Sequence, residues 1–512
     1  MPHVVTQACC GDASCVYACP VNCIHPTPDE PGFGTAEMLY IDPSTCVDCG
    51  ACVTACPVGA IVPGHRLPAG QERFTDVNAS MYGEDATVEF GVTDARFPVN
   101  PSHRLPLAPI DQPRRLRVEE PISVGIVGSG PSAMYAADEL LRHPQVSVVM
   151  YERLDRPFGL ARFGVAPDHT STRTVMRLFD DIARNPRLDI MLGSEIGRDL
   201  DLDDLRGRHD AILWAGGAPT DRRLDIPGID ARGVASATSF VGWYNDHPDF
   251  ADLDVDLAHT TEAVVVGTGN VALDVARILV SDPAKLASTT ISRHALEELR
   301  RSTVRRVTVV GRRGAEYAAF TLPELIGLVD GGTPVTVDAA EIPDTADVAA
   351  SDDPTVGAKL ALLREIAERP VPTGPHIRFA FGRSPAAIET DPTGHATGLR
   401  VTHADGSAET LDAGLVLTSI GYRGRPVPGL PFDDARGVVP NESGRVVGDD
   451  GPVPGMYVTG WIKRGPSGFI GTNKTDSAET VTTLLSDLEA MAPASPGAPV
   501  PTRRRIPRTT RN

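Results

Sequence analysis

Short apolar runs alternate with amphipathic stretches along most of the chain after residue 121. Such runs predict buried strands, and the stretches at 133–141 and 271–280 predict helices. The predicted strands are residues 123–127, 146–151, 211–214, 263–266, 307–310, 415–420 and 456–459. Strands that alternate with helices indicate parallel sheets covered by helices on both faces. The expected fold class is therefore multidomain α/β.

The remaining segments lack this pattern. Residues 64–121 are rich in proline, which predicts a long linker with little structure of its own. Residues 491–512 combine a Pro/Ala/Gly stretch with five arginines, which predicts a disordered basic tail.

The composition narrows the class of protein. A chain of 512 residues is too long for one ordinary core, so several domains are expected. No apolar run is long enough to predict a membrane span, and the net charge of −19 argues against nonspecific binding of nucleic acid. The first residues do not resemble a signal peptide, so a cytoplasmic protein is expected.

All nine cysteines lie between Cys9 and Cys56. An odd number of cysteines without a signal peptide favours metal binding over a disulfide framework. Residues 1–65 also hold six acidic residues and no Lys or Arg. The sequence thus predicts a small metal-binding module whose acidic surface suits docking to a basic partner surface.

The clearest motif is the run from Cys46 to Pro57, which also contains Cys49, Cys52 and Cys56. Its C-x2-C-x2-C-x3-C-P spacing is that of bacterial ferredoxins, where three thiolates bind one iron–sulfur cubane and the fourth binds a second cluster. A zinc site is the alternative, but zinc prefers two separated pairs of ligands.

The first cysteine run keeps C-x3-C-P at Cys15 and Cys19 but lacks the middle cysteine. Here the chain resembles the seven-iron bacterial ferredoxins. The resemblance implies that Cys9, Cys15 and Cys56 hold a [3Fe-4S] cluster. It implies that a [4Fe-4S] cluster is held by Cys19, Cys46, Cys49 and Cys52. Cys10 and Cys23 are left over, and a first loop shorter than usual leaves Cys10 either a fourth ligand, giving a second [4Fe-4S] cluster, or a free buried thiol, which we favour.

A glycine-rich turn follows the first predicted strand of the α/β region. Gly128 suits the tight turn, and Gly130 lets the backbone approach a pyrophosphate at the helix N-terminus. Glu152 ends the next strand 22 residues after Gly130, close to the spacing of a ribose-binding carboxylate. Strand, turn, helix and acid together predict a dinucleotide site.

The segment after Glu152 resembles the adrenodoxin-reductase-type ferredoxin–NADP reductases. The resemblance implies that FAD is contacted by Ser132, Glu152, Leu160 and Ile196. It also places His169 near the flavin. On the residues alone, His169 is a loop histidine that bonds backbone.

A second glycine turn contains Thr268, Gly269, Asn270 and Val271. The strand that follows, 307–310, leads to Arg312 and Arg313 instead of an acid. Two guanidiniums can bind a 2′-phosphate, so this site is expected to prefer NADP over NAD. The alternative is a solvated basic turn.

The same resemblance assigns residues near the nicotinamide. It places Glu324 there, which on the residues alone is an ordinary acid in the first turn of a helix. The position of a second acid often found in the family holds Gly327. His169 and Glu324 are thus the candidate catalytic residues, for protonation and nicotinamide placement.

A dense segment near the C-terminus resembles the flavin-binding segment of the same reductases. The resemblance implies that the isoalloxazine is lined by Trp461, Gly468, Phe469 and Ile470. Flavin-binding sequence this late in the chain indicates that the NADP domain is inserted in the FAD domain.

The whole chain resembles the fused ferredoxin/ferredoxin–NADP reductases of actinobacteria. The implied fold is an α+β dicluster ferredoxin domain followed by two Rossmann-like domains. The expected boundaries are 1–63 for the ferredoxin, 64–121 for the linker, 122–217 and 419–490 for the FAD domain, 218–418 for the NADP domain and 491–512 for the tail. Whether the ferredoxin docks on its own reductase stays open.

The resemblance implies an iron–sulfur flavoenzyme that exchanges a hydride between NADPH and FAD and single electrons through its clusters. The implied cofactors are FAD, NADP(H), a [4Fe-4S] cluster and a second [3Fe-4S] or [4Fe-4S] cluster. The implied partner is a ferredoxin or another one-electron carrier, including carriers that feed cytochromes P450. The alternatives are a redox-sensing or docking protein with little turnover, and an electron-input subunit like the small subunit of glutamate synthase, whose cysteine spacing differs.

Overall fold

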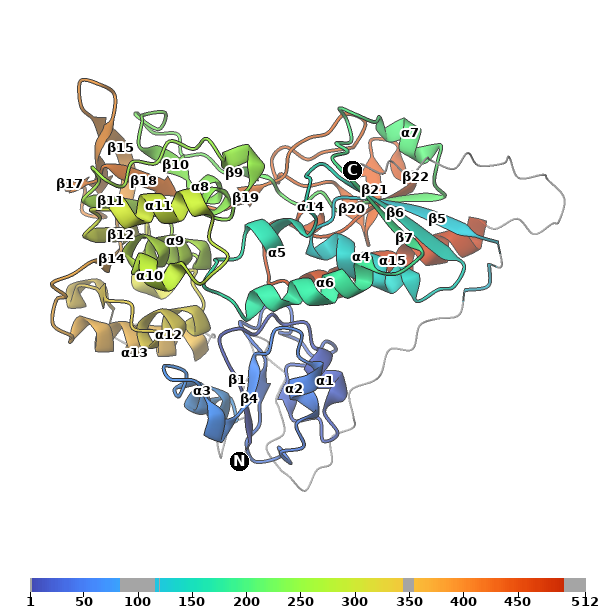
Figure 1. Ribbon diagram of the computed structural model, residues 1–512, viewed down its shortest axis with the longest axis horizontal. Helices are drawn as coiled ribbons and strands as arrows, with labels where there is room; N and C mark the ends of the chain where they lie inside the picture. The colour runs from blue at the N-terminus through green and yellow to red at the C-terminus, as the bar shows by residue number, and fades with distance from the viewer. Residues whose placement is uncertain (1, 83–115, 119, 344–353, 492–512) are drawn as a thin grey trace.

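The computed structural model describes residues 2–82, 116–118, 120–343 and 354–491. Figure 1 shows three bodies: an N-terminal head in blue, an FAD-type domain in cyan and red, and an NADP-type domain in green, yellow and orange. The head lies beneath the junction of the other two. Within the described residues, no helix is long and apolar enough to cross a membrane.

The FAD-type domain is built on a seven-stranded sheet in the order β20-β21-β22-β8-β5-β6-β7. The last five strands of that order are parallel, and β20 and β21 run antiparallel at one edge. The strands are β5 (Ile122–Val127), β6 (Val146–Glu152), β7 (Leu188–Leu192), β8 (Ala211–Trp214), β20 (Asn441–Glu442), β21 (Arg445–Gly448) and β22 (Gly451–Val458). The helices are α4 (Pro131–Leu141), α5 (Gly159–Phe163), η2 (Thr172–Thr174), α6 (Val175–Ala183), α7 (Leu202–Arg206), α14 (Trp461–Arg464) and α15 (Thr472–Met491).

Alternate side chains of β8 enter two different cores, as the pleat of a buried strand requires. Leu213 packs with residues of α4, α6 and α15. Ile212 and Trp214 pack on the other face with residues of α7 and β22. Both faces of this sheet are covered, as the apolar runs predict.

The NADP-type domain contains a six-stranded parallel sheet in the order β10-β18-β11-β12-β14-β13. Its strands are β10 (Val234–Ser236), β11 (Glu262–Val266), β12 (Arg306–Val310), β13 (Val335–Thr336), β14 (His376–Ala380) and β18 (Leu415–Thr418). Its helices are α8 (Ala237–Tyr244), η3 (Pro248–Phe250), α9 (Asn270–Val280), α10 (Pro283–Leu286), α11 (Arg293–Arg301), η4 (Ala315–Tyr317), α12 (Leu322–Asp330), η5 (Ala339–Glu341) and α13 (Pro354–Ala367).

The second sheet departs from the expectation of helices on both faces. One face is covered by an antiparallel sheet, β15 (Ser384–Thr390), β16 (Ala396–Thr402) and β17 (Ala408–Asp412). Leu399 of β16 packs with Val264 and Val416 of the parallel sheet. An apolar strand shows only that its faces are buried. Its sequence could not tell whether a helix or another sheet covers a given face.

Two short strands connect the nucleotide domains. The chain leaves the FAD-type domain through β9 (Thr220–Asp221) and returns through β19 (Tyr422–Arg423), which pair antiparallel. The strand β22 then re-enters the first sheet beside β8. The predicted insertion of the NADP domain is confirmed.

The head has two similar halves. Its elements are β1 (His3–Val5), α1 (Ser14–Ala18), β2 (Ile24–His25), β3 (Tyr40–Ile41), α2 (Ala51–Ala55) and β4 (Ile61–Pro63), with β1 paired to β4 and β2 to β3. Left-handed backbone recurs at a spacing of 37 residues, at Gly11 and Asp48, Ala13 and Gly50, and Asn22 and Gly59. The same spacing relates the cysteines of the two runs and sets Asp12 opposite Cys49.

The head extends beyond the predicted boundary at residue 63. Residues 64–82, expected to be linker, form η1 (Gly64–Arg66) and α3 (Phe74–Ser80) and pack on the head. Asn78 explains this, because its amide donates to Val5 O at 2.8 Å and its Oδ1 accepts from Ile41 N at 3.0 Å. The Pro-rich composition concealed this anchoring helix. Residues 83–115 of the expected linker and 492–512 of the expected tail lie outside the described residues.

Candidate active site

A cavity of about 500 Å³ lies where the head and the two nucleotide domains meet. Its size is that of a cofactor site. Most of the predicted flavin and nicotinamide residues line it: Gly128, Gly130, Ser132, Glu152, Leu160, His169, Ile196, Val271, Glu324, Trp461, Gly468, Phe469 and Ile470. Gln7, Cys9 and Cys10 of the head line it as well.

The first glycine turn has the backbone shape that a pyrophosphate site needs. Gly128 has a φ of 100°, and a Cβ there would lie 2.6 Å from Ala215 O. No atom lies within 4 Å of a Cβ built on Gly130, so the start of α4 is open to a ligand. Open backbone at a helix N-terminus is suited to phosphate oxygens.

Glu152 is held against this turn. Its Oε2 accepts from Ser129 N at 3.0 Å and from Ser129 Oγ at 2.6 Å, and its Oε1 accepts from Leu154 N at 2.9 Å. The side chain is buried at the end of β6 and lines the cavity. Oε1 accepts only one hydrogen bond and keeps a lone pair for a ribose hydroxyl.

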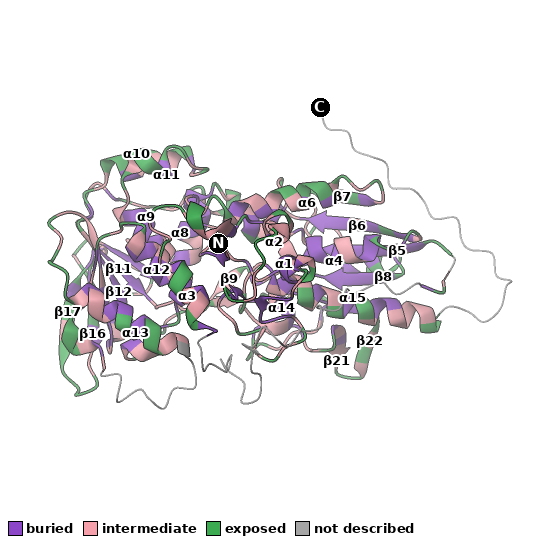
Figure 2. Ribbon diagram, turned by 90° about the horizontal axis from the view of Figure 1, so that it is seen from below, coloured by how far each residue is buried: buried purple, intermediate pink, exposed green. Residues whose placement is uncertain are grey.

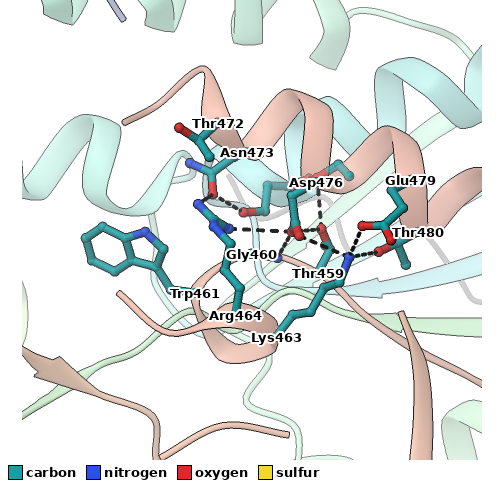
Figure 3. Close-up of polar contacts among 12 residues, drawn as sticks. Thr459, Gly460, Trp461, Lys463, Arg464, Thr472, Asn473, Asp476, Glu479 and Thr480 are labelled. Atoms are coloured by element: carbon teal, nitrogen blue, oxygen red, sulfur yellow. Dashed lines mark hydrogen bonds and ion pairs between the residues drawn. The ribbon is translucent and has the colours of Figure 1, made fainter. Parts of the chain in front are cut away.

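The C-terminal flavin segment is fixed by a polar network (Figure 3). Asp476 of α15 accepts from Thr459 Oγ1 at 2.8 Å and from Gly460 N at 2.5 Å. Lys463 Nζ lies 3.0 Å from the same carboxylate. Gly460 has a φ of 81°, and a Cβ there would lie closer than 3.0 Å to Ser132 Oγ, so this position favours glycine. The network joins α14 and α15 to α4.

Trp461 points away from this network (Figure 3) and lines the cavity. Its ring centroid lies 5.0 Å from that of Tyr422, and its Nε1 donates to Ser467 O at 3.1 Å. Gly468 has a φ of 79°, which bends the chain beside Phe469. An open glycine turn, an acid at a strand end and an aromatic wall together fit FAD.

His169 and Glu324 come together with a third acid, Asp274 of α9. His169 Nε2 lies 3.5 Å from Asp274 Oδ1 and 3.9 Å from Glu324 Oε2. Arg277 donates to Asp274 at 2.7 Å and to Asp168, the neighbour of His169, at 2.7 Å. The three groups could chelate a cation, but Arg277 already supplies a positive charge to them.

Burial raises the pKa of Glu324, and Asp274 adds to the rise, while His169, Arg277 and a hydrogen bond from Gln7 oppose it. A raised pKa lets a carboxyl hold its proton at a higher pH than usual, as a general acid requires. The position fits the predicted role beside the nicotinamide.

The second glycine turn has a similar shape at the start of α9. Gly267 has a φ of 125°, and a Cβ there would lie closer than 3.0 Å to Ser419 O. Thr268 Oγ1 and Asn270 Oδ1 accept from the backbone of Ala319 and Thr321, at 3.3 Å and 2.9 Å. These two predicted NADP residues therefore anchor the segment that leads into α12.

Arg312 and Arg313 follow β12 and are exposed. The Arg313 guanidinium lies over the ring of Tyr317, 4.8 Å from its centroid. These arginines, Thr268, Gly269 and Asn270 do not line the cavity. Their role toward a 2′-phosphate stays a prediction.

The second cysteine set lies at the outer side of the head. His3, Cys19, Cys46, Cys49 and Cys52 line a small pocket with Cys23. Cys49 is exposed, and the side chain of Val47 is 59% exposed. This set reaches the surface of the protein.

Cys23, which the sequence analysis assigned to neither cluster, lies within that set. Its Sγ is 3.5 Å from Cys19 Sγ, and its hydrogen bonds lower the pKa of Cys19 to about 6 and that of Cys46 to about 5. Cys23 therefore favours the thiolate form of two predicted iron ligands, as a neighbouring hydrogen-bond donor does.

The first cysteine set lies on the inner side, toward the cavity. Burial raises the pKa of Cys9 to about 11 and that of Cys15 well above its ordinary value, and neighbouring thiolates add to both rises. Buried thiolates that repel one another are stabilised by a cationic iron core. The donor set fits an iron–sulfur cluster. Cys10 is buried beside Cys9 and Cys56, and whether it binds iron stays open.

The head docks on the FAD-type domain through backbone as well as charge. Gly471 N donates to Cys10 O at 2.8 Å. Lys474 Nζ donates to Ser14 Oγ at 2.9 Å and lies 3.5 Å from Asp12 Oδ2. A Cβ on Gly471 would lie closer than 3.0 Å to Cys10 O and the backbone of residues 11–12, so the approach is as close as two backbones allow.

The head also docks on the NADP-type domain. Glu37 accepts from Leu322 N at 2.7 Å and from Lys359 Nζ at 3.2 Å. Arg73, which directly precedes α3, pairs with Asp330 at 2.9 Å. Figure 2, seen from below, shows α1, α2 and α3 lying across both nucleotide domains. Two acids of the head thus contact the protein's own lysines, and the head docks on its own reductase, a question that the sequence left open.

Some residues of this site were not predicted. Asp274 and Arg277 lie one turn apart on α9, a spacing that marks a shared helix face but not its neighbours. Gln7 and Glu37 gave no signal, because their contacts are made across more than 280 positions of sequence.

Comparison with known proteins agrees with the domain order. Two models of a 4Fe-4S dicluster domain match residues 8–60 and 38–94, and an NAD(P)-binding Rossmann-like domain matches residues 126–192. The "Probable ferredoxin/ferredoxin--NADP reductase" of Mycobacterium tuberculosis is 51% identical over 494 residues, which cover 95% of this chain and 84% of that protein. The namesake from Mycobacterium leprae is 50% identical, with coverage of 96% and 87%.

Two further relatives match about three quarters of the chain. The human mitochondrial NADPH:adrenodoxin oxidoreductase is 41% identical over 408 residues, covering 74% of this chain and 81% of that protein. The structure of Mycobacterium tuberculosis FprA in complex with NADPH superposes with a TM-score of 0.68 at 42% identity, covering 72% of this chain and 85% of that one.

Proposed function

Because the chain belongs to the ferredoxin/ferredoxin–NADP reductase family, we propose that it is an oxidoreductase that moves electrons between NADPH and one-electron carrier proteins. The observation that supports this most is the docked head. Cys9 and Cys10 of the head line the same cavity as the first glycine turn and as Val271 and Glu324 of the NADP-type domain. A head that served only for docking to a partner or for redox sensing would not need to line the cofactor cavity.

The cofactors supply the redox chemistry: FAD takes up a hydride from NADPH, and iron–sulfur clusters carry electrons singly. The residues orient and insulate them. Gly128, Gly130 and Glu152 would hold the FAD diphosphate and ribose, and Trp461 with Phe469 would flank its ring. Leu160, Ile196 and Ile470 would exclude water.

The NADP half of the site would be held by other residues. Arg312 and Arg313 would bind the 2′-phosphate, and Gly269 and Val271 would admit the diphosphate to α9. His169 and Glu324 would place the nicotinamide and hold or release protons. Asp274 lies 3.5 Å from His169, and Arg277 donates to Asp168, the neighbour of His169. These two residues would therefore orient the pair.

The placement of the thiols supports an internal route. Cys9 lines the cavity, whereas Cys49 reaches the protein surface. Cys9, Cys15 and Cys56 would hold the inner cluster, and Cys19, Cys46, Cys49 and Cys52 the outer one. A ferredoxin or another carrier would then exchange electrons near Val47.

The domain boundaries and the cellular location are part of this proposal. The ferredoxin domain is assigned residues 1–82, the FAD domain 122–217 and 419–490, and the NADP domain 218–418. Nine free cysteines and predicted iron–sulfur ligands suit the reducing cytoplasm.

The test uses the full chain loaded with FAD and iron. NADPH-dependent reduction of a cytochrome is expected to require both cofactors, and iron and sulfide analysis with EPR is expected to find two clusters. A fully loaded protein that reduces neither dye nor cytochrome would contradict the proposal.

A further inference from the structure

The head does not only approach the cavity; it contributes a hydrogen bond to the candidate nicotinamide site. Gln7 Nε2 donates to Glu324 Oε2 at 2.7 Å. The same oxygen lies 3.9 Å from His169 Nε2, beyond hydrogen-bond distance. Gln7 therefore holds this oxygen within ion-pair range of His169 but too far away for a hydrogen bond to it.

The opposite wall is shaped to admit Gln7. A Cβ built on Gly327, one turn beyond Glu324 in α12, would lie closer than 3.0 Å to the carboxamide of Gln7. Three atoms of that carboxamide would be struck, so even alanine at this position would displace it. The missing side chain on α12 and the amide on the head are complementary.

The backbone of the head fixes Gln7 from the other side. Thr6 N and Thr6 Oγ1 both donate to Ala60 O, at 2.8 Å and 2.9 Å. Cys9 N donates to Thr6 O at 3.1 Å. Gln7 thus sits in a turn that begins at the β1–β4 sheet and ends at a predicted iron ligand.

We propose that Gln7 is a positioning residue of the reductase site: the docked head holds the Glu324 carboxylate away from His169, so that hydride transfer from NADPH is fast only when the head is docked. This inference rests on the proposed function. It adds that the head acts on the nicotinamide half-reaction, upstream of its own reduction.

The experiment compares Gln7→Met and Gly327→Ala in the full-length holoenzyme. Gln7→Met removes the donor but keeps the length of the side chain, and Gly327→Ala displaces Gln7 without changing the head. The limiting rate of flavin reduction by NADPH is expected to fall about tenfold in each, which corresponds to about 1.4 kcal/mol. The dissociation constant of NADP⁺, measured by calorimetry, is expected to change less than twofold.

A double-substitution cycle tests whether both changes act through one contact. Gly327→Ala is expected to have almost no further effect when Gln7 is already methionine. Gly357→Ala is the matched control, because Gly357 lies in α13 with no atom within 4 Å of a Cβ; its rate is expected to equal that of the unsubstituted protein.

Each contrary result has a distinct meaning. Flavin reduction at the unsubstituted rate in Gln7→Met would refute the role of Gln7. An equal effect of Gly327→Ala in both backgrounds would show that it acts elsewhere, and would also refute the inference. If the unsubstituted holoenzyme itself shows no flavin reduction by NADPH, the proposed function fails instead.

Discussion

The docking of the head is most sharply tested at Gly471. The added methyl of Gly471→Ala would meet Cys10 O and the backbone of residues 11–12 at less than 3.0 Å. Backbone cannot rotate aside as a flexible side chain can, so the head must move away. That movement also breaks the hydrogen bond from Gly471 N to Cys10 O.

The size of the effect follows from these two losses. Overpacking of a close contact costs about 1–3 kcal/mol, and a lost hydrogen bond costs about 1 kcal/mol. Together they amount to about 2–4 kcal/mol, which weakens docking about 30- to 700-fold. The remaining contacts, such as Arg73 with Asp330, keep the head tethered but not aligned.

The assay follows two steps after mixing with NADPH. Reduction of the clusters, measured by rapid-freeze EPR, is expected to slow by at least tenfold in Gly471→Ala. Flavin reduction is expected to fall only as far as it does in Gln7→Met. Backbone hydrogen exchange at residues 10–12 reports docking directly, and Gly357→Ala with FAD and iron analyses provides the control. Unchanged cluster reduction together with unchanged exchange would refute the docking argument.

Three further predictions concern charge. Arg312→Ala with Arg313→Ala is expected to raise the KM for NADPH at least tenfold and that for NADH less than twofold, since only NADPH carries a 2′-phosphate; equal losses would contradict this. Lys474→Met leaves the buried Asp12 without its cation, so cluster reduction should slow severalfold and lose part of its salt dependence, as stopped-flow at two ionic strengths would show. Burial raises the pKa of Glu324 above 4.5, so its neutral form favours the fold and stability falls as pH rises through the raised value; Glu324→Gln should therefore raise the melting temperature more at neutral pH than near pH 4.5, and a pH-independent difference would count against it.

The binding motifs were predictable from the sequence, because each of them depends on residues that are close together in the chain. The turn at Gly128, the acid at Glu152 and the spacing of Cys46 to Cys56 each depend on neighbours within a few dozen residues. The structure brings Gly128 and Glu152 to one cavity, and it brings Cys46, Cys49 and Cys52 to a separate pocket of the head. The insertion of the NADP domain was also predictable, since flavin-binding sequence resumed at Trp461.

What depends on contacts between domains was not predictable. We predicted a linker for residues 64–82 because the segment 64–121 as a whole is rich in proline. That composition does not reveal Asn78, the single residue that anchors the segment to the head. Glu37 reads as one acid among six until Lys359 is seen beside it. Gly327 reads as a missing acid, whereas the structure shows that its missing side chain makes room for Gln7.

The 37-residue repeat within the head has a consequence for how the head contacts other electron-transfer proteins. Gly11 and Asp48 share left-handed backbone, so the loop that meets the FAD-type domain has a counterpart in the loop at Val47 and Cys49. One loop is covered by Gly471, and the other is exposed. An external carrier that docks near Val47 would therefore meet the same kind of backbone turn that contacts Gly471. The head thus has two loops of similar backbone shape: one is covered by the reductase in this structure, and the other would stay accessible to a carrier.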